Sequence, residues 1–329
     1  MKLLLTGYPG WLTSRFFETL SDYPRSIDGI RVLMLPGQKV PEEHAGKLEF
    51  AYGNVLDPAT LDQATAGVDV VLHAVGVLHV KHNSDYYHVN RDGTRHILEA
   101  CVRTGVKRFI YISSNAAQGF CRGKGTELSE SDPCRPRSHY GISKYEGEQV
   151  VRQFQETHKI ETVILRPAMF YGPPVPSRHI DIFKRIQNGR FPVFGDGENL
   201  RSLTYIDHLV QAIHLVLKNP KANGQIYYIA DQEIPTLNQI LQAMADALRV
   251  PVRIIRLPRW LARIAEMVDL MIAKVNLYWM LPHLIGESDK NIACRIDKAK
   301  RELGYVPTVD YREGYRRTIA WCREHRLLD

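Results

Sequence analysis

The chain has 329 residues, of which 44% are hydrophobic and 24% charged, and its formal net charge is +7. These values are ordinary for a globular protein. The basic residues are interspersed with acidic ones and form no stripe, which argues against a nucleic-acid partner. The five cysteines are scattered without a C-x-x-C pair, so neither a disulfide framework nor a metal site is expected. No secretory signal is recognised either, and a cytoplasmic location is the expectation.

Short apolar runs alternate with helical patterns through the first half of the chain. This alternation predicts βαβ units and a doubly wound α/β fold, in which a parallel sheet is buried on both faces. The clearest helix is expected over 86–104, ending before Gly105. The expected strands span 2–6, 30–35, 48–52, 69–74, 107–113 and 162–166.

A glycine turn, T-G-Y-P-G-W-L-T at positions 6–13, follows the first expected strand and opens a helix. In this context a glycine turn indicates dinucleotide binding. Gly7 permits the tight turn, and Gly10 lets a pyrophosphate approach the helix N-terminus. The sequence therefore predicts a nucleotide site at the carboxyl end of the first strand.

A tyrosine and a lysine stand four residues apart in S-H-Y-G-I-S-K, as Tyr140 and Lys144. On a helix this spacing places both side chains on one face. A phenol has an ordinary pKa near 10, and a neighbouring ammonium group stabilises its phenolate, which brings proton transfer into range at neutral pH. Ser114, at the end of the fifth expected strand, would add a hydrogen bond to the reacting oxygen. Ser114, Tyr140 and Lys144 are therefore the expected catalytic residues.

The composition changes after residue 172 to a mixture punctuated by proline and glycine. We expect residues 1–172, with 203–230 returning, to form a dinucleotide-binding domain, and 173–202 with 231–329 to form a smaller substrate-binding or lid domain. Residues 258–272 form an amphipathic helical pattern. Residues 275–288 are apolar but too short and proline-broken to span a bilayer. Core or lid packing is favoured for this stretch, with peripheral membrane contact or an apolar substrate mouth as the alternatives.

Taken together, these motifs resemble the extended short-chain dehydrogenase/reductase family, including its NAD-dependent epimerase/dehydratase and 3β-hydroxysteroid dehydrogenase branches. The matches follow the family's order over most of the chain and include the glycine turn, Asn90 to Thr94, the Tyr140 and Lys144 pair, and Arg166-Pro167. The resemblance implies cofactor contacts at Gly7, Pro9, Gly10, Trp11, Leu12, Lys39, Asn54, Val55, Ala74, Gly76, Asn90, Tyr140, Lys144, Pro167 and Met169. It implies substrate contacts at His79, Asn115, His139, Met169 and Arg201, and a homodimer paired through the helices at 86–104 and 140–155.

Three residues depart from the family pattern. Thr13 stands where a third glycine is usual, so looser packing of helix on strand and weaker cofactor binding are expected. Residues 35–39 contain no acid to hold ribose hydroxyls, and Lys39 or Arg15 is placed to meet a 2′-phosphate, which favours NADP(H) over NAD(H). Asn54 replaces an aspartate that often contacts adenine.

The run after Ser114 is Asn115-Ala116-Ala117 and lacks the acids that dehydrating or decarboxylating relatives usually carry there. The site is therefore expected to perform hydride transfer alone. His79, His82 and His139 are possible second acid or base groups, although a loop or solvent-facing role is favoured for each.

The substrate is left open between two classes. Arg201 lies where nucleotide-sugar epimerases place a phosphate-binding arginine, which suits a sugar nucleotide. Met169 stands where those enzymes usually have an asparagine, and the segment around it resembles branches that act on bulky apolar alcohols and ketones. A dehydrogenase or reductase of 3β-hydroxysteroid dehydrogenase type is favoured; a 4-epimerase or 4-ketoreductase of nucleoside-diphosphate sugars is the alternative, and a non-catalytic NADP-binding redox sensor is a minor one.

Overall fold

The computed structural model describes residues 1–23, 27–39, 46–78, 80–123 and 125–328. Within these ranges its centre is a sheet of seven parallel strands in the order β10-β6-β5-β4-β1-β2-β3. The six strands predicted from the sequence all lie in this sheet, which confirms the doubly wound α/β fold. The strands are β1 (Lys2–Thr6), β2 (Gly29–Met34), β3 (Glu49–Tyr52), β4 (Val70–His73), β5 (Arg108–Ile112), β6 (Glu161–Pro167) and β10 (Gln225–Ile229).

The strand order reverses between β1 and β4. From β1 the chain builds outward to β2 and β3 on one side, then returns to add β4, β5 and β6 on the other. Such a reversal leaves a crevice at the carboxyl ends of the two central strands, where ligands of doubly wound proteins bind. Leu3, Leu4 and Leu5 of β1 are fully buried because helices cover both faces of the sheet.

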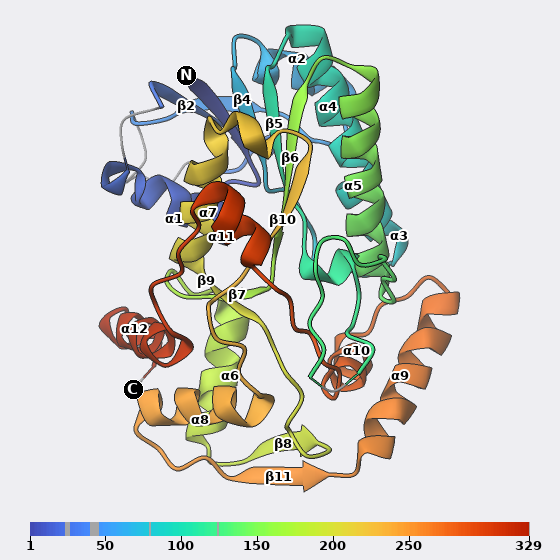
Figure 1. The fold of residues 1–329 in the computed structure, drawn as a ribbon, viewed down its shortest axis with the longest axis vertical. Coiled ribbons are helices and arrows are strands. Elements are labelled where there is room, and N and C mark those ends of the chain that lie inside the picture. Colours follow the sequence, from blue (N-terminus) through green and yellow to red (C-terminus); the bar gives the residue numbers. More distant parts are fainter. Residues whose placement is uncertain (24–26, 40–45, 79, 124, 329) are drawn as a thin grey trace.

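Two helical layers cover the sheet (Figure 1). On one face lie α2 (Leu61–Thr65), α4 (Gly93–Thr104) and α5 (His139–Thr157); on the other lie α1 (Trp11–Glu18), α7 (Ile206–Leu217) and α11 (Asp297–Leu303). The helix expected over 86–104 is present as α3 (Ser84–Tyr87), one π-helical turn (His88–Asp92) and α4. It ends as predicted, with Gly105 in the left-handed conformation at φ 77°.

A second lobe with its own apolar core lies beyond the carboxyl ends of the strands (Figure 1). It contains α6 (Ser177–Gln187), α8 (Leu237–Leu248) and α12 (Tyr311–Glu324), together with the small sheets β7–β9 (Met169–Tyr171, Leu203–Tyr205) and β8–β11 (Phe191–Phe194, Ile254–Leu257). A hairpin of α9 (Arg259–Lys274) and α10 (Met280–Glu287) stands at its edge. The domain boundaries expected from the sequence stay a prediction.

Candidate active site

The glycine turn between β1 and α1 has the geometry that a dinucleotide requires. Gly7 adopts φ +86°, and a Cβ atom there would lie 2.8 Å from the carbonyl oxygen of Ala74, so only glycine fits. Gly10 precedes the first residue of α1, and its amide donates to the Gly7 carbonyl over 2.8 Å. The turn therefore presents the N-terminus of α1 at the crevice between β1 and β4.

Thr13 fills the place of the third glycine without leaving a buried polar group unsatisfied. Its side chain is 1% exposed, and its hydroxyl lies 3.0 Å from the carbonyl oxygen of Gly7 and 3.2 Å from that of Gly10. These contacts brace the turn from inside the helix. The weaker cofactor binding expected from this residue stays a prediction.

Trp11, directly after the glycine turn, contacts the second lobe. Its indole nitrogen donates to the carbonyl of Gly172 over 3.2 Å, and its ring lies 4.8 Å from that of Phe170. Leu12 is buried beneath the turn, whereas Pro9 is exposed on its surface. The loop that would receive a pyrophosphate is thus held by both lobes.

The two basic residues suggested for a 2′-phosphate differ in the structure. Arg15 makes a bidentate pair with Asp207 at 2.6 and 3.0 Å, and this hydrogen-bonded pairing raises the pKa of its guanidinium. Arg15 therefore joins α1 to α7, and the suggestion that it meets a cofactor phosphate is not supported by this arrangement. Lys39 is exposed in the segment that follows β2.

The expected adenine and ribose contacts lie beyond β3 and β4. The Asn54 side chain accepts a hydrogen bond from the amide of Leu56 over 2.9 Å, which shapes the turn, and Val55 is buried beside it. Gly76 follows β4, and a Cβ atom on it would lie 3.5 Å from the Asn90 amide oxygen and 3.7 Å from the Lys144 ammonium nitrogen.

Asn90 links this strand end to α5, the helix that carries Tyr140 and Lys144. It is fully buried in the π-helical turn, accepts from the Val77 amide over 3.3 Å and donates to the Ser143 hydroxyl over 2.9 Å. Such π turns inside helices frequently occur at functional sites. Asn90 therefore holds the segment after β4 against α5.

The structure brings the Ser114 turn against the helical turn that carries Tyr140. Ser114 follows β5, and its hydroxyl oxygen accepts from the Ala116 amide over 3.2 Å. Tyr140 lies in the first turn of α5, with its ring edge-on to that of Tyr86 at 5.9 Å. Gly141 makes the close approach possible, since a Cβ atom there would lie 2.5 Å from the Ala116 carbonyl oxygen.

Lys144 lies one helical turn further along α5 and is 3% exposed. Its ammonium nitrogen donates to the carbonyl of Ile112 over 2.7 Å and lies 4.4 Å from the centre of the Tyr111 ring. Burial lowers its pKa to about 7, partly opposed by the charge of Glu148. A nearby anion would stabilise the charged form of this buried ammonium group, and a phenolate at Tyr140 would supply that anion.

The helical hairpin of the second lobe closes over Tyr140. A cavity of about 50 Å³ is lined by Tyr140, Arg137 and residues of the hairpin. One of these, His283, forms a hydrogen bond with Asp269 at 3.0 Å; burial alone would lower its pKa, but this bond and the charges of Glu287 and Asp269 raise it. No sequence motif signals that 259–287 folds back on α5, so the positions of Arg137, Asp269 and His283 beside Tyr140 could not be predicted.

Of the expected substrate residues, His139 and Met169 lie where a ligand can reach them. His139 lines a cavity of about 560 Å³, bonds the Tyr87 hydroxyl at 2.7 Å, and has its pKa lowered by burial. Met169 is 47% exposed, and Pro167 lies buried at the end of β6. Asn115 is half-buried beside Ser114. His79 lies outside the described residues.

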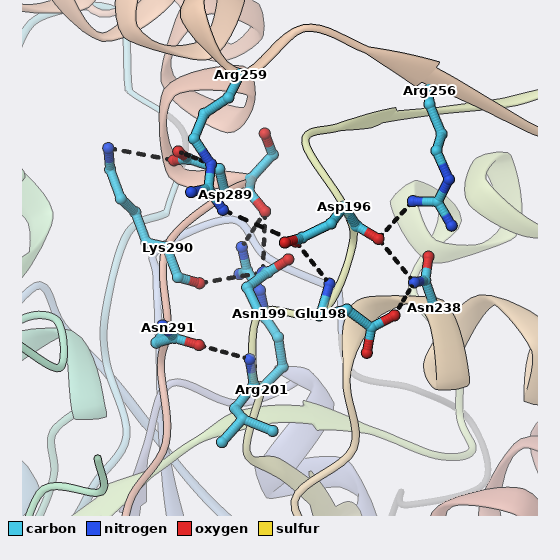
Figure 2. A network of polar contacts seen from close by, with 12 residues as sticks. Asp196, Glu198, Asn199, Arg201, Asn238, Arg256, Arg259, Asp289, Lys290 and Asn291 are labelled. Carbon is cyan, nitrogen blue, oxygen red and sulfur yellow. Dashed lines mark hydrogen bonds and ion pairs between the residues drawn. The ribbon is translucent and has the colours of Figure 1, made fainter. Parts of the chain in front are cut away.

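Arg201 is engaged with the end of the hairpin. Its guanidinium donates to the backbone carbonyls of Glu287 and Ser288 over 2.6 and 3.1 Å, while its buried Nε atom has no hydrogen-bond partner among the described residues. Figure 2 shows the surrounding network, in which Asn199 and the Leu200 amide also bind the chain beyond α10. In this arrangement Arg201 holds the carboxyl end of the α9–α10 hairpin against the rest of the second lobe.

Comparison with known proteins gives a consistent result. The model of the NAD dependent epimerase/dehydratase family matches residues 3–230. The N-acetyl-α-D-glucosaminyl-diphospho-ditrans,octacis-undecaprenol 4-epimerase of Escherichia coli O157:H7 is 30% identical, over 100% of this chain and 97% of its own. The 3β-hydroxysteroid-dehydrogenase/decarboxylase isoform 2 of Arabidopsis thaliana is 29% identical, over 96% of this chain and 61% of its own. A solved structure, the dTDP-glucose 4,6-dehydratase DesIV from Streptomyces venezuelae with NAD and TYD bound, is 26% identical with a TM-score of 0.79, covering 99% of this chain and 98% of that one.

Proposed function

This chain belongs to the NAD-dependent epimerase/dehydratase family, the extended short-chain dehydrogenase/reductase type of enzyme, and from that premise we propose that it is a 4-epimerase of a sugar carried on a diphosphate. The observation that supports this chemistry is the packing of the Ser114 turn, which follows β5, against the first turn of α5, which carries Tyr140, with Lys144 one helical turn further along α5 and bonded to the end of β5. The substrate assignment is supported by the full-length similarity to the 4-epimerase of E. coli.

The residues of the glycine turn fit a nicotinamide dinucleotide. Gly7 and Gly10 allow the tight turn that presents the N-terminus of α1 to a pyrophosphate, because a Cβ atom on either would strike a backbone oxygen, and Gly76 places no side chain beside Lys144 and Asn90. A bound cofactor would supply the hydride acceptor for the carbinol carbon and, in its reduced form, the hydride donor.

The chain's own residues handle the proton. In the first half-reaction the alcohol O–H proton passes to the Tyr140 phenolate while the C–H electron pair leaves as hydride, so the alcohol becomes a ketone. Lys144 stabilises the phenolate, and Ser114 donates a hydrogen bond to the reacting oxygen. In the return step Tyr140 gives the proton back to the oxygen, and return of the hydride to the opposite face of the carbonyl carbon would invert that carbon.

Hydride transfer without dehydration is supported by the turn after Ser114. Residues Asn115, Ala116 and Ala117 supply no carboxyl group for the additional proton steps of elimination. Arg137, which is 71% exposed, lines both the cavity with Tyr140 and a neighbouring one of about 330 Å³. We propose that this guanidinium binds the diphosphate.

The second candidate function is the oxidation or reduction of a bulky apolar alcohol or ketone. It is favoured by the exposed side chain of Met169 and by the apolar cavity that Met267, Leu270 and Met271 line beside His139. A non-catalytic redox sensor is a minor third candidate, which the complete catalytic set disfavours.

Two finer points are also proposed. The absence of an acid at 35–39 and the exposed Lys39 support NADP(H), although the solved neighbour named above holds NAD. Packing through α4 and α5 would give a homodimer, which light scattering tests.

An isotope experiment separates these functions. A sugar diphosphate ester carrying deuterium at C4 is incubated with the enzyme and a small amount of NAD or NADP. We expect the C4 epimer to retain its deuterium, with no net change in the near-ultraviolet absorbance of the reduced cofactor. Net cofactor reduction matching product would instead support the dehydrogenase, and neither product nor reduction with any substrate would support the sensor.

A further inference from the structure

The α9–α10 hairpin, residues 259–287, carries an unusual concentration of exposed apolar side chains. Of the large apolar residues that are exposed in the described part of the chain, eleven of eighteen lie in this segment. Ala262 is the one buried residue of α9. The eleven residues are Trp260, Ile264, Met267, Leu270, Met271, Val275, Leu277, Trp279, Met280, Leu281 and Leu284. The hairpin therefore presents to solvent the kind of surface that a folded core normally covers.

The polarity of α9 is ordered around its axis. Trp260, Ile264, Met267 and Met271 follow a spacing of four, three and four residues and so share one outward face. The acids point the other way. Glu266 pairs with Lys290 at 2.7 Å and packs against Gly286 of α10, and Asp269 pairs with His283 at 3.0 Å.

The exposed charges that flank the apolar face are positive. Arg263 and Lys274 are exposed and lie on the helix beside the outward apolar residues, and neither forms an ion pair with an acid in the described part of the chain. Apolar residues including tryptophan on one face, bordered by Lys and Arg, are typical of helices that lie in a membrane interface. No helix in the described part of the chain is long and apolar enough to cross a membrane.

The apolar face is continuous with the route to the catalytic tyrosine. Met267, Leu270, Met271 and Lys274 line the cavity of about 560 Å³, and Leu270 and Ala273 also line the small cavity that contains Tyr140. A surface against which the hairpin rests would therefore lie at the mouth of the site. In Figure 1 the hairpin stands at the edge of the second lobe, with α9 outermost.

We propose that the α9–α10 face docks on the headgroup region of an anionic lipid bilayer and opens the Tyr140 cavity toward it. Resting on the proposed function, this names the substrate class: the sugar diphosphate is carried by a membrane lipid. Positive charge at Arg263 and Lys274 complements an anionic headgroup layer, which favours a bilayer over a second copy of this basic chain. The acyl chains of the lipids then cover the apolar side chains of the hairpin that are otherwise exposed to water.

Vesicle flotation of the full-length protein tests docking without substrate or cofactor. Phosphatidylcholine vesicles with and without phosphatidylglycerol are compared at about 0.1 M salt, where charges act over roughly 10 Å. We expect the protein to float with the anionic vesicles. Trp260→Asp combined with Ile264→Asp should weaken binding about tenfold or more. The control is Val306→Asp, since Val306 is 58% exposed and Trp260 57%, and it should bind as the unaltered protein does.

Reversing two charges tests the electrostatic contribution to vesicle binding. Arg263→Glu with Lys274→Glu should weaken binding to anionic vesicles by about fivefold or more per residue. Lys159→Glu with Lys221→Glu, at exposed positions on the other lobe, should not. Thermal unfolding verifies that each variant is folded. Absence of flotation, or an equal loss of vesicle binding in the control variants, overturns the proposal. A Trp260→Asp protein that forms a smaller species in light scattering also overturns it, because the face is then an interface between copies of the chain.

A second measurement separates this proposal from the proposed function. The Trp260→Asp and Ile264→Asp protein should lose turnover of a long-chain lipid diphosphate sugar in vesicles but retain turnover of a short-chain, water-soluble analogue. Equal loss on both substrates would contradict delivery from the bilayer. Flotation by a protein that turns over neither substrate would leave docking supported and the proposed function refuted.

Discussion

Replacing Gly141 with alanine tests whether the close approach of two turns builds the catalytic geometry. A Cβ atom there would lie 2.5 Å from the Ala116 carbonyl oxygen, whereas ordinary contacts begin at 3.4 Å, so the two turns must separate by about 0.9 Å. That shift moves Ser114 away from Tyr140. Misplacement on this scale costs up to about a hundredfold in kcat, and we expect a fall of about 10- to 100-fold.

The same substitution should change protein stability only moderately and should leave cofactor affinity unchanged. Overpacking at one position lowers the free energy of unfolding by about 1–3 kcal/mol, so the protein should fold but melt earlier. Cofactor affinity, measured by fluorescence titration, should stay near its original value because the glycine turn after β1 is not touched. Gly29→Ala is the matched control, since its Cβ would meet Lys2 at an unstrained 3.8 Å. Unchanged kcat in Gly141→Ala, or an equal loss of cofactor affinity, would refute the reasoning.

Three further substitutions give distinct outcomes. Lys39→Ala should narrow the difference between NADPH and NADH affinity in a fluorescence titration; an unchanged difference would remove Lys39 from the cofactor site. Arg201→Ala removes two charge-assisted hydrogen bonds, worth about 1.5–3 kcal/mol each, and should lower the melting temperature more than substrate affinity; calorimetry showing micromolar UDP, dTDP or GDP binding that this variant loses would instead assign Arg201 to a nucleotide sugar. His283→Asn should destabilise the protein most below pH about 6.5, with the deficit shrinking as pH rises through the raised pKa of His283; a deficit that grows with pH would contradict the Asp269 pairing.

The sign of the His283 effect follows from its folded-state pKa. Because the pKa is raised above its unfolded value, the protonated ring contributes stability that is fully present below the unfolded pKa. That contribution is lost as pH rises through the folded pKa. Denaturant unfolding at several pH values measures it.

Local sequence patterns predicted most of the central sheet and the helix that carries Tyr140 and Lys144. The run at 2–6 coincides with β1, and the glycine at 105 ends its helix as predicted, because strand alternation and helix caps depend on neighbouring residues. The four-residue spacing of Tyr140 and Lys144 predicted for the same reason that both side chains lie on one face of a helix. The π-helical turn at Asn90 was missed, since it reflects tertiary contacts with Ser143 rather than a local preference.

Contacts between distant segments were not predictable in this way. Arg15 pairs with Asp207 across 192 residues, and no periodicity in either segment identifies the partner. The same holds for the hairpin, whose sequence indicated an amphipathic helix but not that its inner face would close over Tyr140. The lid packing favoured from the sequence applies to the inner face of the hairpin. The apolar side chains on its outer face are exposed to solvent.

The most direct test of the central claim is the turnover of Tyr140→Phe, measured together with its cofactor affinity. Loss of the phenolic proton should lower turnover by at least about a hundredfold, while the ring keeps its packing against Tyr86 and cofactor affinity is retained. Near-normal turnover in the folded variant would contradict the assignment of Tyr140 as the group that moves the proton.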